Sequence, residues 1–248
     1  MGDRSRTGAA HAFTDGIARV AAAPTVLAGT IAIVSFYGGS ADVRHAIGAV
    51  LIWAFLSGGV LDRYARRRAT RARGFFGACG AHLGAMLRLA LVNALLLGAF
   101  HLAIGGDFPN GYVHEAAFVI ALFLTLVLSF AQVRIAVEDR RSALGALLGG
   151  ARFVFRNPAS IVLFSVFVLA AMGVLLASER LVPASNYWVI AEGAIVLECF
   201  LALAWLATAV SLFQARLAHD GYTAAPPMTW PESPAAEAIA NASPAVTP

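Results

Sequence analysis

The chain has 248 residues, of which 59% are hydrophobic and 13% are charged, and its mean hydropathy is +0.75. A soluble globular protein of this length would have too little polar surface to cover itself, so the composition excludes that class and indicates an integral membrane protein. The formal net charge is +4, and all eighteen basic residues are arginine. Exclusive use of arginine in an alanine-rich chain is typical of a GC-rich bacterial genome.

Six apolar segments approach or exceed the length that a membrane-spanning helix needs. We predict spans at residues 20–37, 43–61, 89–104, 116–133, 159–177 and 187–213. A signal peptide is the alternative for the first of them, but no small-x-small cleavage site is evident before Gly38. A retained helix is therefore favoured.

The segments on either side of this region differ from it in composition. Residues 1–19 are polar and are predicted to be a cytoplasmic N-terminal segment, while the six-span membrane domain is predicted to cover 20–218. Residues 219–248 contain six of the ten prolines and much alanine. Such a segment cannot bury enough apolar surface to fold, so we predict a disordered cytoplasmic tail.

Two basic stretches, 62–88 and 132–158, have no apolar run long enough to cross a membrane. In the second, apolar residues recur at the spacing of one helical face, at Leu144, Leu147, Leu148, Ala151 and Phe155. The first has a similar stripe at Phe75, Phe76, Cys79, Leu83, Met86 and Leu87. We predict that each stretch contains an amphipathic helix on the membrane surface, with its stripe in the acyl boundary and its arginines among the phosphates.

Local signals define the ends of the second amphipathic helix. Asp139 or Ser142 can cap its start, because both side chains accept hydrogen bonds from free backbone N–H groups. Asn157 should end it, since the residue before a proline is displaced from the helical region. Pro158 is then suited to be the first residue of the next helix.

The charged residues around this bend have two interpretations. Glu138-Asp139, beside Arg134, Arg140 and Arg141, are interpreted as an ion-pair network that holds the bend. The exposed arginines of the stretch are candidates for contact with anionic lipid headgroups or a partner protein. These candidates are Arg140, Arg141, Arg152 and Arg156.

The distribution of arginine predicts the orientation. Sixteen of the eighteen arginines lie in the N-terminal segment, the two basic stretches and the C-terminal segment, and only Arg44 and Arg180 lie on the opposite side. By the positive-inside rule, both termini and both amphipathic helices are predicted to be cytoplasmic. A role of these arginines in setting the membrane topology is enough to explain which side they lie on. That role does not require the arginines to lie on amphipathic helices.

The two basic stretches also resemble each other. Gly77 precedes Arg88 by eleven residues, and Gly145 precedes Arg156 by the same number. Each stretch also contains an Asp-Arg pair ahead of its glycine. We interpret them as parallel repeats related by an axis near the membrane normal, with the first and sixth spans added at the ends. Chance similarity between basic loops of an alanine-rich chain is the alternative.

Several motifs carry a family resemblance. They are GGVLDRYARRR at 58–68, FFGACG at 75–80, LRLALV at 87–92 and VRIAVEDRRSALGALLGGARFV at 133–154. On these motifs the chain resembles a group of uncharacterised six-helix bacterial integral membrane proteins. Its second half is loosely similar to the membrane domain fused to some glycerophosphodiester phosphodiesterases. The resemblance implies the fold and the inner (plasma) membrane, and it implies no catalytic residues.

Motifs for chemistry are scarce. Asp15-Gly16-Ile17-Ala18-Arg19 resembles the opening of the CDP-alcohol phosphotransferase motif, but it is one residue short and the later aspartates are absent, so we reject it. No Walker loop, HExxH or GxSxG occurs, and the six histidines are scattered. We predict no cofactor, no metal site, no disulfide between Cys79 and Cys199, and no nucleic-acid partner.

Four polar residues within predicted spans are candidate intramembrane site residues. Glu198 lies near the bilayer centre, where a charge costs at least about 2.5 kcal/mol, so it must be protonated, paired or in contact with water. Asn93 could meet it at a similar depth, while Glu192 and His101 lie nearer the outer surface. The alternative to a proton or substrate site is an interhelical hydrogen bond from neutral Glu198, which contributes about 0.6 kcal/mol.

The prediction as a whole is an all-α polytopic membrane protein with six transmembrane helices and no enzymatic activity. Its two cytoplasmic amphipathic helices would organise membrane lipid, a partner membrane protein or a second copy of the chain. The main alternative is a small transporter or transporter subunit with Glu198 as its coupling carboxylate. An enzyme that acts on lipids is the third possibility.

Overall fold

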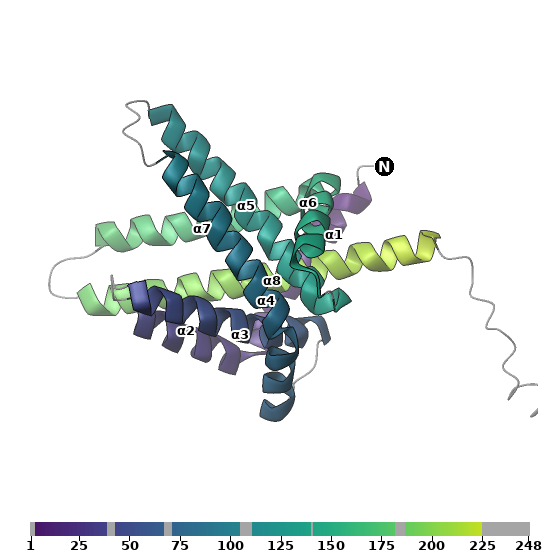
Figure 1. Ribbon diagram of the computed structural model, residues 1–248, viewed down its shortest axis with the longest axis horizontal. Helices are drawn as coiled ribbons and strands as arrows, with labels where there is room; N and C mark the ends of the chain where they lie inside the picture. Colours follow the sequence, from purple (N-terminus) through teal and green to yellow (C-terminus); the bar gives the residue numbers. More distant parts are fainter. Residues whose placement is uncertain are drawn as a thin grey trace, which may run out of the picture. The chain divides into compact units, whose positions relative to one another are not determined.

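A computed structural model describes most of the chain, namely residues 3–38, 43–66, 71–104, 111–139, 141–181 and 187–224. Within these residues the backbone forms helices joined by short turns, which confirms the predicted all-helical class. The helices are α1 Asp3–Ala21, α2 Pro24–Gly38, α3 Val43–Arg66, α4 Ala72–Ile104, α5 Gly111–Glu138, α6 Ala143–Arg156, α7 Pro158–Leu181 and α8 Tyr187–Ala224 (Figure 1). The described residues up to Ala215 form one compact unit, and a second unit begins at Arg216 and contains the end of α8.

Five of the described helices are long and apolar enough to cross a membrane. Their candidate spans are Ile47–Arg66, Ala72–Leu96, Glu115–Glu138, Pro158–Arg180 and Ile190–Leu217. Four of these spans, in α3, α5, α7 and α8, lie at predicted positions. The span in α4 overlaps the predicted span 89–104 only at residues 89–96 and otherwise covers the first basic stretch. By the length and composition of its helices, the chain is therefore a polytopic helical membrane protein.

The predicted first span is divided between two helices. α1 ends at Ala21 and α2 begins at Pro24, which leaves α2 only 15 residues long. Proline has no backbone N–H and disfavours helical geometry in the residue before it, so the chain turns at Ala23. A helix of this length is shorter than the roughly 20 residues that usually cross the hydrocarbon core.

The first basic stretch also differs from its prediction. The sequence predicts a surface helix up to Arg88 and a separate span from Leu89, whereas α4 runs without a break through both for 33 residues. Residues 85–97 contain neither glycine nor proline and are mostly strong helix formers, so nothing ends the helix at Arg88. The start of this stretch belongs to α3, which ends at Arg66.

The ends of α6 agree with the local signals. Ser142 is its N-cap, and the Ser142 side chain accepts a hydrogen bond from the Gly145 backbone N–H. Asn157 is its C-cap, and α7 begins at Pro158. Asp139, the other predicted cap, instead has a positive φ of 52° and forms part of the turn after α5.

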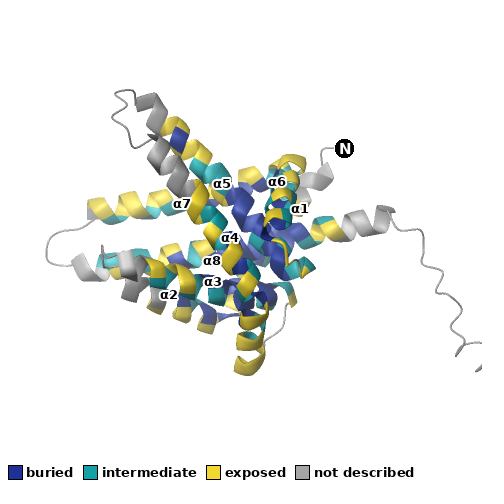
Figure 2. Ribbon diagram, viewed as in Figure 1, coloured by how far each residue is buried: buried dark blue, intermediate teal, exposed yellow. Residues whose placement is uncertain are grey.

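The most deeply buried segment is 203–213 of α8, in which every residue is buried (Figure 2). Trp205 lies at its centre, in contact with Phe130 of α5 and with Phe164 and Phe167 of α7 at ring-centroid distances of 5.9, 5.0 and 5.9 Å. A run that is buried on all sides must be enclosed by other helices. α8 is therefore the central helix of this part of the unit.

The N-terminal segment takes part in this core. α1 covers most of the predicted polar segment 1–19, and its Ala12 and Val20 are 2% and 1% exposed. A Cβ on Gly16 would lie 2.7 Å from the Thr208 backbone nitrogen, so only glycine allows α1 this close to α8. In the sequence, this buried face of α1 is marked by mostly small residues at helical spacing, namely Ala9, Ala12, Gly16 and Val20.

The C-terminal end of the fold differs slightly from the prediction. α8 continues to Ala224, so residues 219–224 are helical and do not belong to an unstructured tail. The remainder of the predicted disordered tail, 225–248, lies outside the described residues.

Candidate functional site

The α6 helix has two different faces. Its buried face consists of small residues and one valine, Ala143, Ala146, Gly150 and Val154. A Cβ on Gly150 would lie 2.8 Å from the Val127 carbonyl oxygen and 3.0 Å from the Ala131 nitrogen, both on α5. The backbones of α5 and α6 therefore approach closely. Phe155 contacts Phe123 with ring centroids 5.5 Å apart, which makes α6 antiparallel to α5 (Figure 1).

The opposite face of α6 carries its large apolar side chains. Leu144, Leu148 and Phe155 are 63%, 72% and 73% exposed. The other two residues of the predicted apolar stripe, Leu147 and Ala151, are half-buried at its edge. The predicted stripe is thus largely the exposed face of α6. Its core-facing side consists of the small-residue stripe and Phe153, whose ring lies 4.7 Å from that of Phe130 and 5.1 Å from that of Phe213.

Arginines flank this exposed apolar face. Arg152 and Arg156 are both exposed, and with 3.6 residues per turn they lie on one side of the line from Leu148 to Phe155. Arg141 is also exposed, ahead of the helix, and Arg140 lies outside the described residues. Three of the four predicted arginine candidates are therefore accessible on or beside α6.

The described part of the bend before α6 contains one of the predicted ion pairs. Arg134 pairs with Glu138 at 2.9 Å, with both side chains 18% exposed, and its guanidinium lies against Gly149 of α6. Asp139, which was predicted to join the same ion-pair network, makes a different contact. Asp139 faces His82 of α4, with 3.9 Å between Oδ1 and Nδ1.

A second contact joins α4 to the same bend. Arg88 Nη1 donates to the Arg141 carbonyl oxygen at 3.1 Å. The bend between α5 and α6 is therefore attached to α4 through a backbone acceptor at Arg141, and the Arg141 side chain remains exposed.

A buried polar network at α1 has no counterpart in the sequence predictions. Arg19, only 8% exposed, pairs with Asp15 at 2.7 Å and donates to the Tyr64 carbonyl oxygen at 2.6 Å. Ser211 donates to the same Asp15 carboxylate at 2.6 Å, and Gln214 donates to the Ala65 carbonyl oxygen at 2.9 Å. The rejected Asp15-to-Arg19 motif is thus a structural element that connects α1, α3 and α8.

The predicted pairing of Asn93 with Glu198 is not observed. Asn93 lines a pocket formed by α3, α4 and α5, and Glu198 is not among the lining residues. Glu198 and Glu192 are both exposed on α8, and the side chain of His101 lies outside the described part of α4. Depth along a helix was predicted from the sequence, but the direction in which each side chain points depends on the rotation of the helix about its axis.

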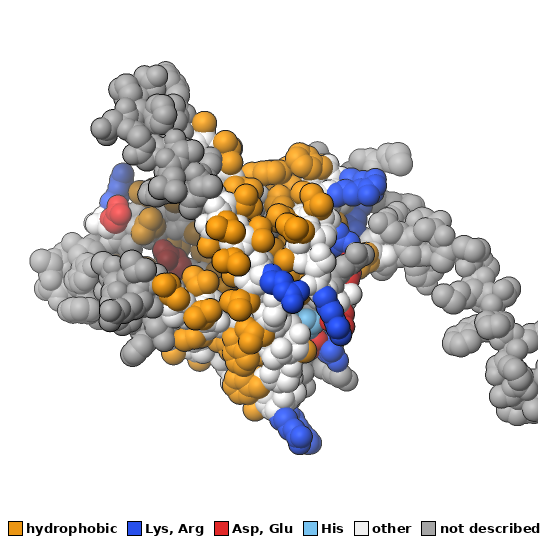
Figure 3. Space-filling view, viewed as in Figure 1, with side chains coloured by type: hydrophobic (Ala, Val, Ile, Leu, Met, Phe, Trp, Pro, Cys, Tyr) orange, Lys and Arg blue, Asp and Glu red, His pale blue; other side chains and the backbone are white. Residues whose placement is uncertain are grey.

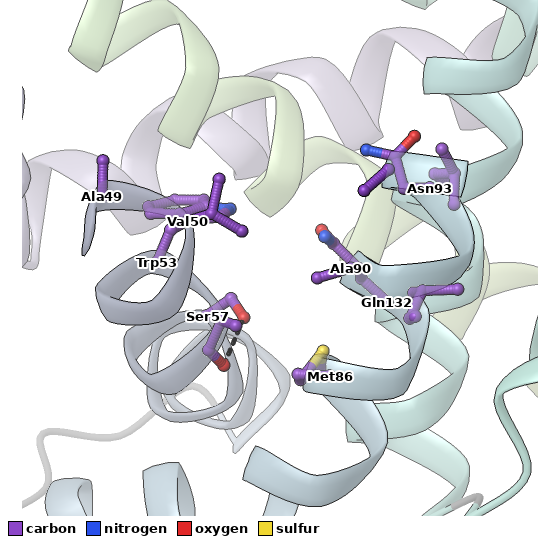
Figure 4. Close-up of a pocket in the computed structure, with 12 residues that line it drawn as sticks. Ala49, Val50, Trp53, Ser57, Met86, Ala90, Asn93 and Gln132 are labelled. Carbon is purple, nitrogen blue, oxygen red and sulfur yellow. Dashed lines mark hydrogen bonds between the residues drawn. The ribbon is translucent and has the colours of Figure 1, made fainter. Parts of the chain in front are cut away.

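The pocket beside Asn93 has a volume of about 510 Å³. Figure 4 shows Trp53 and Ser57 of α3 on one wall, with Asn93 and Gln132 on the opposite wall. Twelve residues line it, namely Ala49, Val50, Trp53, Ala54, Ser57, Met86, Leu89, Ala90, Asn93, Ala94, Leu128 and Gln132. All of them are uncharged. The pocket therefore suits a neutral ligand with a few polar groups.

The described residues contain no group of three or more His, Cys, Asp or Glu side chains that could hold a metal ion. Cys79 and Cys199 are both buried and free. Comparisons of this chain with protein-family models, with curated proteins and with solved structures each find no match.

Proposed function

We propose that this protein is a non-enzymatic component of the bacterial inner membrane whose basic amphipathic helix α6 binds anionic lipid headgroups. One observation carries the proposal. α6 packs on the protein through small residues and Phe153 and leaves Leu144, Leu148 and Phe155 exposed, with Arg152 and Arg156 beside them. An apolar face with flanking arginines matches the boundary between acyl chains and phosphates.

The energetics favour a membrane as the environment of this face. Removing a leucine or phenylalanine side chain from water contributes about 1.5 to 3 kcal/mol, and α6 presents three such side chains. Each arginine near an anionic surface contributes about 1 kcal/mol more. A lipid surface satisfies both groups at once, whereas water satisfies only the arginines.

The distribution of charge supports a cytoplasmic location for α6 and for both termini. Sixteen of the eighteen arginines belong to segments that this topology places in the cytoplasm. Most of the arginine side chains visible in Figure 3 gather toward one side, and hydrophobic side chains cover much of the rest of the described surface in that view. The proposed topology includes α2 as a short sixth membrane helix.

The proposal also holds that the two basic stretches are repeats of one unit and that the chain is related to the six-helix bacterial membrane proteins that it resembles. Aligning Gly77 with Gly145 places His82 opposite Gly150 in the alignment. The helices that contain these residues, α4 and α6, each pack against the helix before them, α3 and α5 respectively. A Cβ on Gly58 of α3 would lie 2.8 Å from the His82 Cβ, so α3 and α4 approach closely, as α5 and α6 do at Gly150. The glycine lies on the first helix of one pair and on the second helix of the other, so the shared feature that supports a common unit is the close pairing of two successive helices.

Lipid binding can be tested by native mass spectrometry on the full-length protein released from nanodiscs of mixed phosphatidylglycerol and phosphatidylcholine. We expect the wild type to retain phosphatidylglycerol, and the double variant Arg152→Gln/Arg156→Gln to retain about 30-fold less, since two charge contacts of about 1 kcal/mol each are lost. Arg180→Gln changes an exposed arginine in the last turn of α7, outside both basic stretches, and serves as the control. Equal retention by all three proteins would overturn the proposal.

A partner protein at the same surface would give a different result. Crosslinking in cells, with wild type beside a variant in which Arg140, Arg141, Arg152 and Arg156 are neutralised, would then capture a specific protein only with the wild type. Such a capture, together with unchanged phosphatidylglycerol retention, would replace lipid by protein as the ligand of α6.

A transporter is the second candidate, and one observation favours it. Glu198 lies within the candidate span Ile190–Leu217 and is exposed on the surface of α8. A carboxyl group at this depth must be neutral or in contact with water or another chain. Proton uptake into proteoliposomes that is lost in Glu198→Gln would establish this alternative.

A further inference from the structure

We infer that a second pocket, formed by α2, α3 and α4, binds a free fatty acid with its carboxylate against Arg63. The inference goes beyond headgroup binding at α6 and does not depend on it, because the two sites share no residue. The second pocket has a volume of about 420 Å³. Ten described residues line it, namely Thr25, Val26, Gly29, Thr30, Leu56, Val60, Arg63, Ala72, Phe75 and Phe76.

The second pocket runs along the end of a candidate span. Leu56, Val60 and Arg63 lie at helical spacing on one face of α3, over a length of about 10 Å. Arg63 is three residues from the end of the candidate span Ile47–Arg66, so it lies near the headgroup level, and Leu56 lies deeper in the bilayer. The pocket therefore extends from the headgroups toward the acyl chains, which is the direction in which a fatty acid lies in a bilayer.

Arg63 determines the charge of the ligand. It is the one charged residue among the ten described lining residues, and it is half-buried. Its Nη2 donates to the Ala22 carbonyl oxygen at 3.3 Å, which leaves most of its five N–H donors for a ligand. Within the described residues it forms no ion pair with a carboxylate, and the neighbouring Asp62 pairs with Arg66 at 2.7 Å. A half-buried guanidinium without a counterion favours an anionic ligand.

The small number of polar groups determines the kind of anion. Thr25 is exposed in the first turn of α2, three residues after the Ala22 carbonyl that accepts from Arg63, which places it at the same end of the pocket as the guanidinium. The Thr30 hydroxyl already donates to the Val26 carbonyl oxygen at 2.9 Å. The guanidinium and one hydroxyl group match the two oxygens of a carboxylate. The ester carbonyl oxygens of a phospholipid would be buried there without donors, so a phospholipid is disfavoured.

The other lining residues suit one acyl chain. Phe75 and Phe76 of α4 lie with their ring centroids 5.5 Å apart, and Phe76 is 54% exposed. Leu56 and Val60 supply apolar surface from α3. A Cβ on Gly29 of α2 would meet no atom within 4 Å, so α2 leaves room beside these side chains. An acyl chain would cover the apolar surface that the pocket presents.

The test uses the full-length protein in phosphatidylcholine vesicles with a photoreactive fatty acid that carries a diazirine on its chain. Two comparison lipids carry the same diazirine, namely the fatty alcohol, which lacks the carboxylate, and phosphatidylglycerol. Peptide mass spectrometry after irradiation measures the labelling of residues 25–30, 56–63 and 72–76. We expect the fatty acid to label these segments about tenfold more than the fatty alcohol, because a hydrogen bond between charged groups is gained. Labelling by phosphatidylglycerol at or above the level of the fatty acid would overturn the inference.

The variants identify the contact. Arg63→Gln should lower fatty-acid labelling about tenfold, to the level of the fatty alcohol, and should leave labelling by the alcohol unchanged. Arg63→Lys keeps the positive charge and should label more strongly than Arg63→Gln. Arg180→Gln removes an exposed arginine in the last turn of α7 and should have no effect on labelling. If the acid and the alcohol label equally, or if Arg63→Gln has no effect, the pocket holds bilayer lipid without selection and the inference is wrong.

A second variant covers the case in which Arg63→Gln fails to fold. Gly29→Leu places a side chain in the open space of the pocket and should abolish fatty-acid labelling there, while the midpoint of thermal unfolding stays at the wild-type value. Persistent labelling in Gly29→Leu would also overturn the inference. Arg152→Gln/Arg156→Gln should leave labelling of this pocket intact, so failure of lipid binding at α6 and failure of this inference can be told apart.

Discussion

The Arg19 guanidinium donates a 2.6 Å hydrogen bond to the carbonyl oxygen of Tyr64, 45 residues further along the chain. Tyr64 lies in the last turn of α3, where backbone carbonyl groups have no partner within the helix. Gln214 of α8 donates to the next carbonyl oxygen, that of Ala65. Side chains from the first and the last helix thus cap the C-terminal end of α3, and the positive charge of Arg19 is also favourable there.

Removal of one member of this network should destabilise the protein. Asp15→Ala leaves the buried Arg19 without its carboxylate, and breaking a buried pair in this way costs about 3 kcal/mol. We expect a lower midpoint of thermal unfolding in detergent micelles, followed by tryptophan fluorescence. The double variant Asp15→Leu/Arg19→Leu should lose less than the two single changes together, since no charge then remains uncompensated. Additive losses would show that the two residues do not act as a pair.

The close approach of α5 and α6 predicts opposite effects of one substitution at two glycines. Gly150→Ala places a Cβ against the backbone of α5 and should cost about 1 to 3 kcal/mol. Gly84→Ala on α4 meets no atom within 4 Å and should be neutral or stabilise by up to about 1 kcal/mol through helix propensity. Thermal unfolding of the two variants provides the comparison, and equal midpoints would argue against the close contact.

The left-handed residue before α6 gives a backbone test. Asp139 has a φ of 52°, a conformation that costs most side chains about 1 to 2 kcal/mol and glycine very little. We therefore expect Asp139→Gly to retain near wild-type thermal stability and Asp139→Ala to lose about 1 kcal/mol. A stability loss of the same size in both variants would instead assign the effect to the contact with His82.

The two functional candidates predict opposite phenotypes. If α6 binds lipid, Leu148→Gln/Phe155→Gln should lower phosphatidylglycerol retention, because the exposed apolar face no longer inserts, while Glu198→Gln should retain it. Native mass spectrometry measures the first property, and proton uptake into proteoliposomes measures any activity of Glu198. Lost uptake in Glu198→Gln with normal uptake in the α6 variant would favour the transporter.

Features set by neighbouring residues were predictable from the sequence. The Ser142 cap, the Asn157 stop and the start of α7 at Pro158 all depend on interactions within one helical turn, and each is observed. The positions of the candidate spans in α3, α5, α7 and α8 follow from apolar length in the same way.

Features set by distant residues were not predictable. Nothing near Asp15 or Arg19 indicates that their partners include Ser211 and the Tyr64 carbonyl oxygen. Asn93 was selected because an amide within a span is costly, but its neighbours depend on how α4 is rotated against α3 and α5. That rotation follows from packing across the bundle, which a single sequence does not reveal.

The enclosed run 203–213 of α8 has a consequence for biosynthesis. Gly16 of α1, Phe130 of α5 and Phe164 of α7 all contact this run, which leaves the ribosome after the other described helices. The preceding helices must therefore enter the bilayer with the place of α8 still occupied by lipid or by chaperone. Emergence of α8, rather than insertion of any earlier helix, is the step at which the described bundle closes.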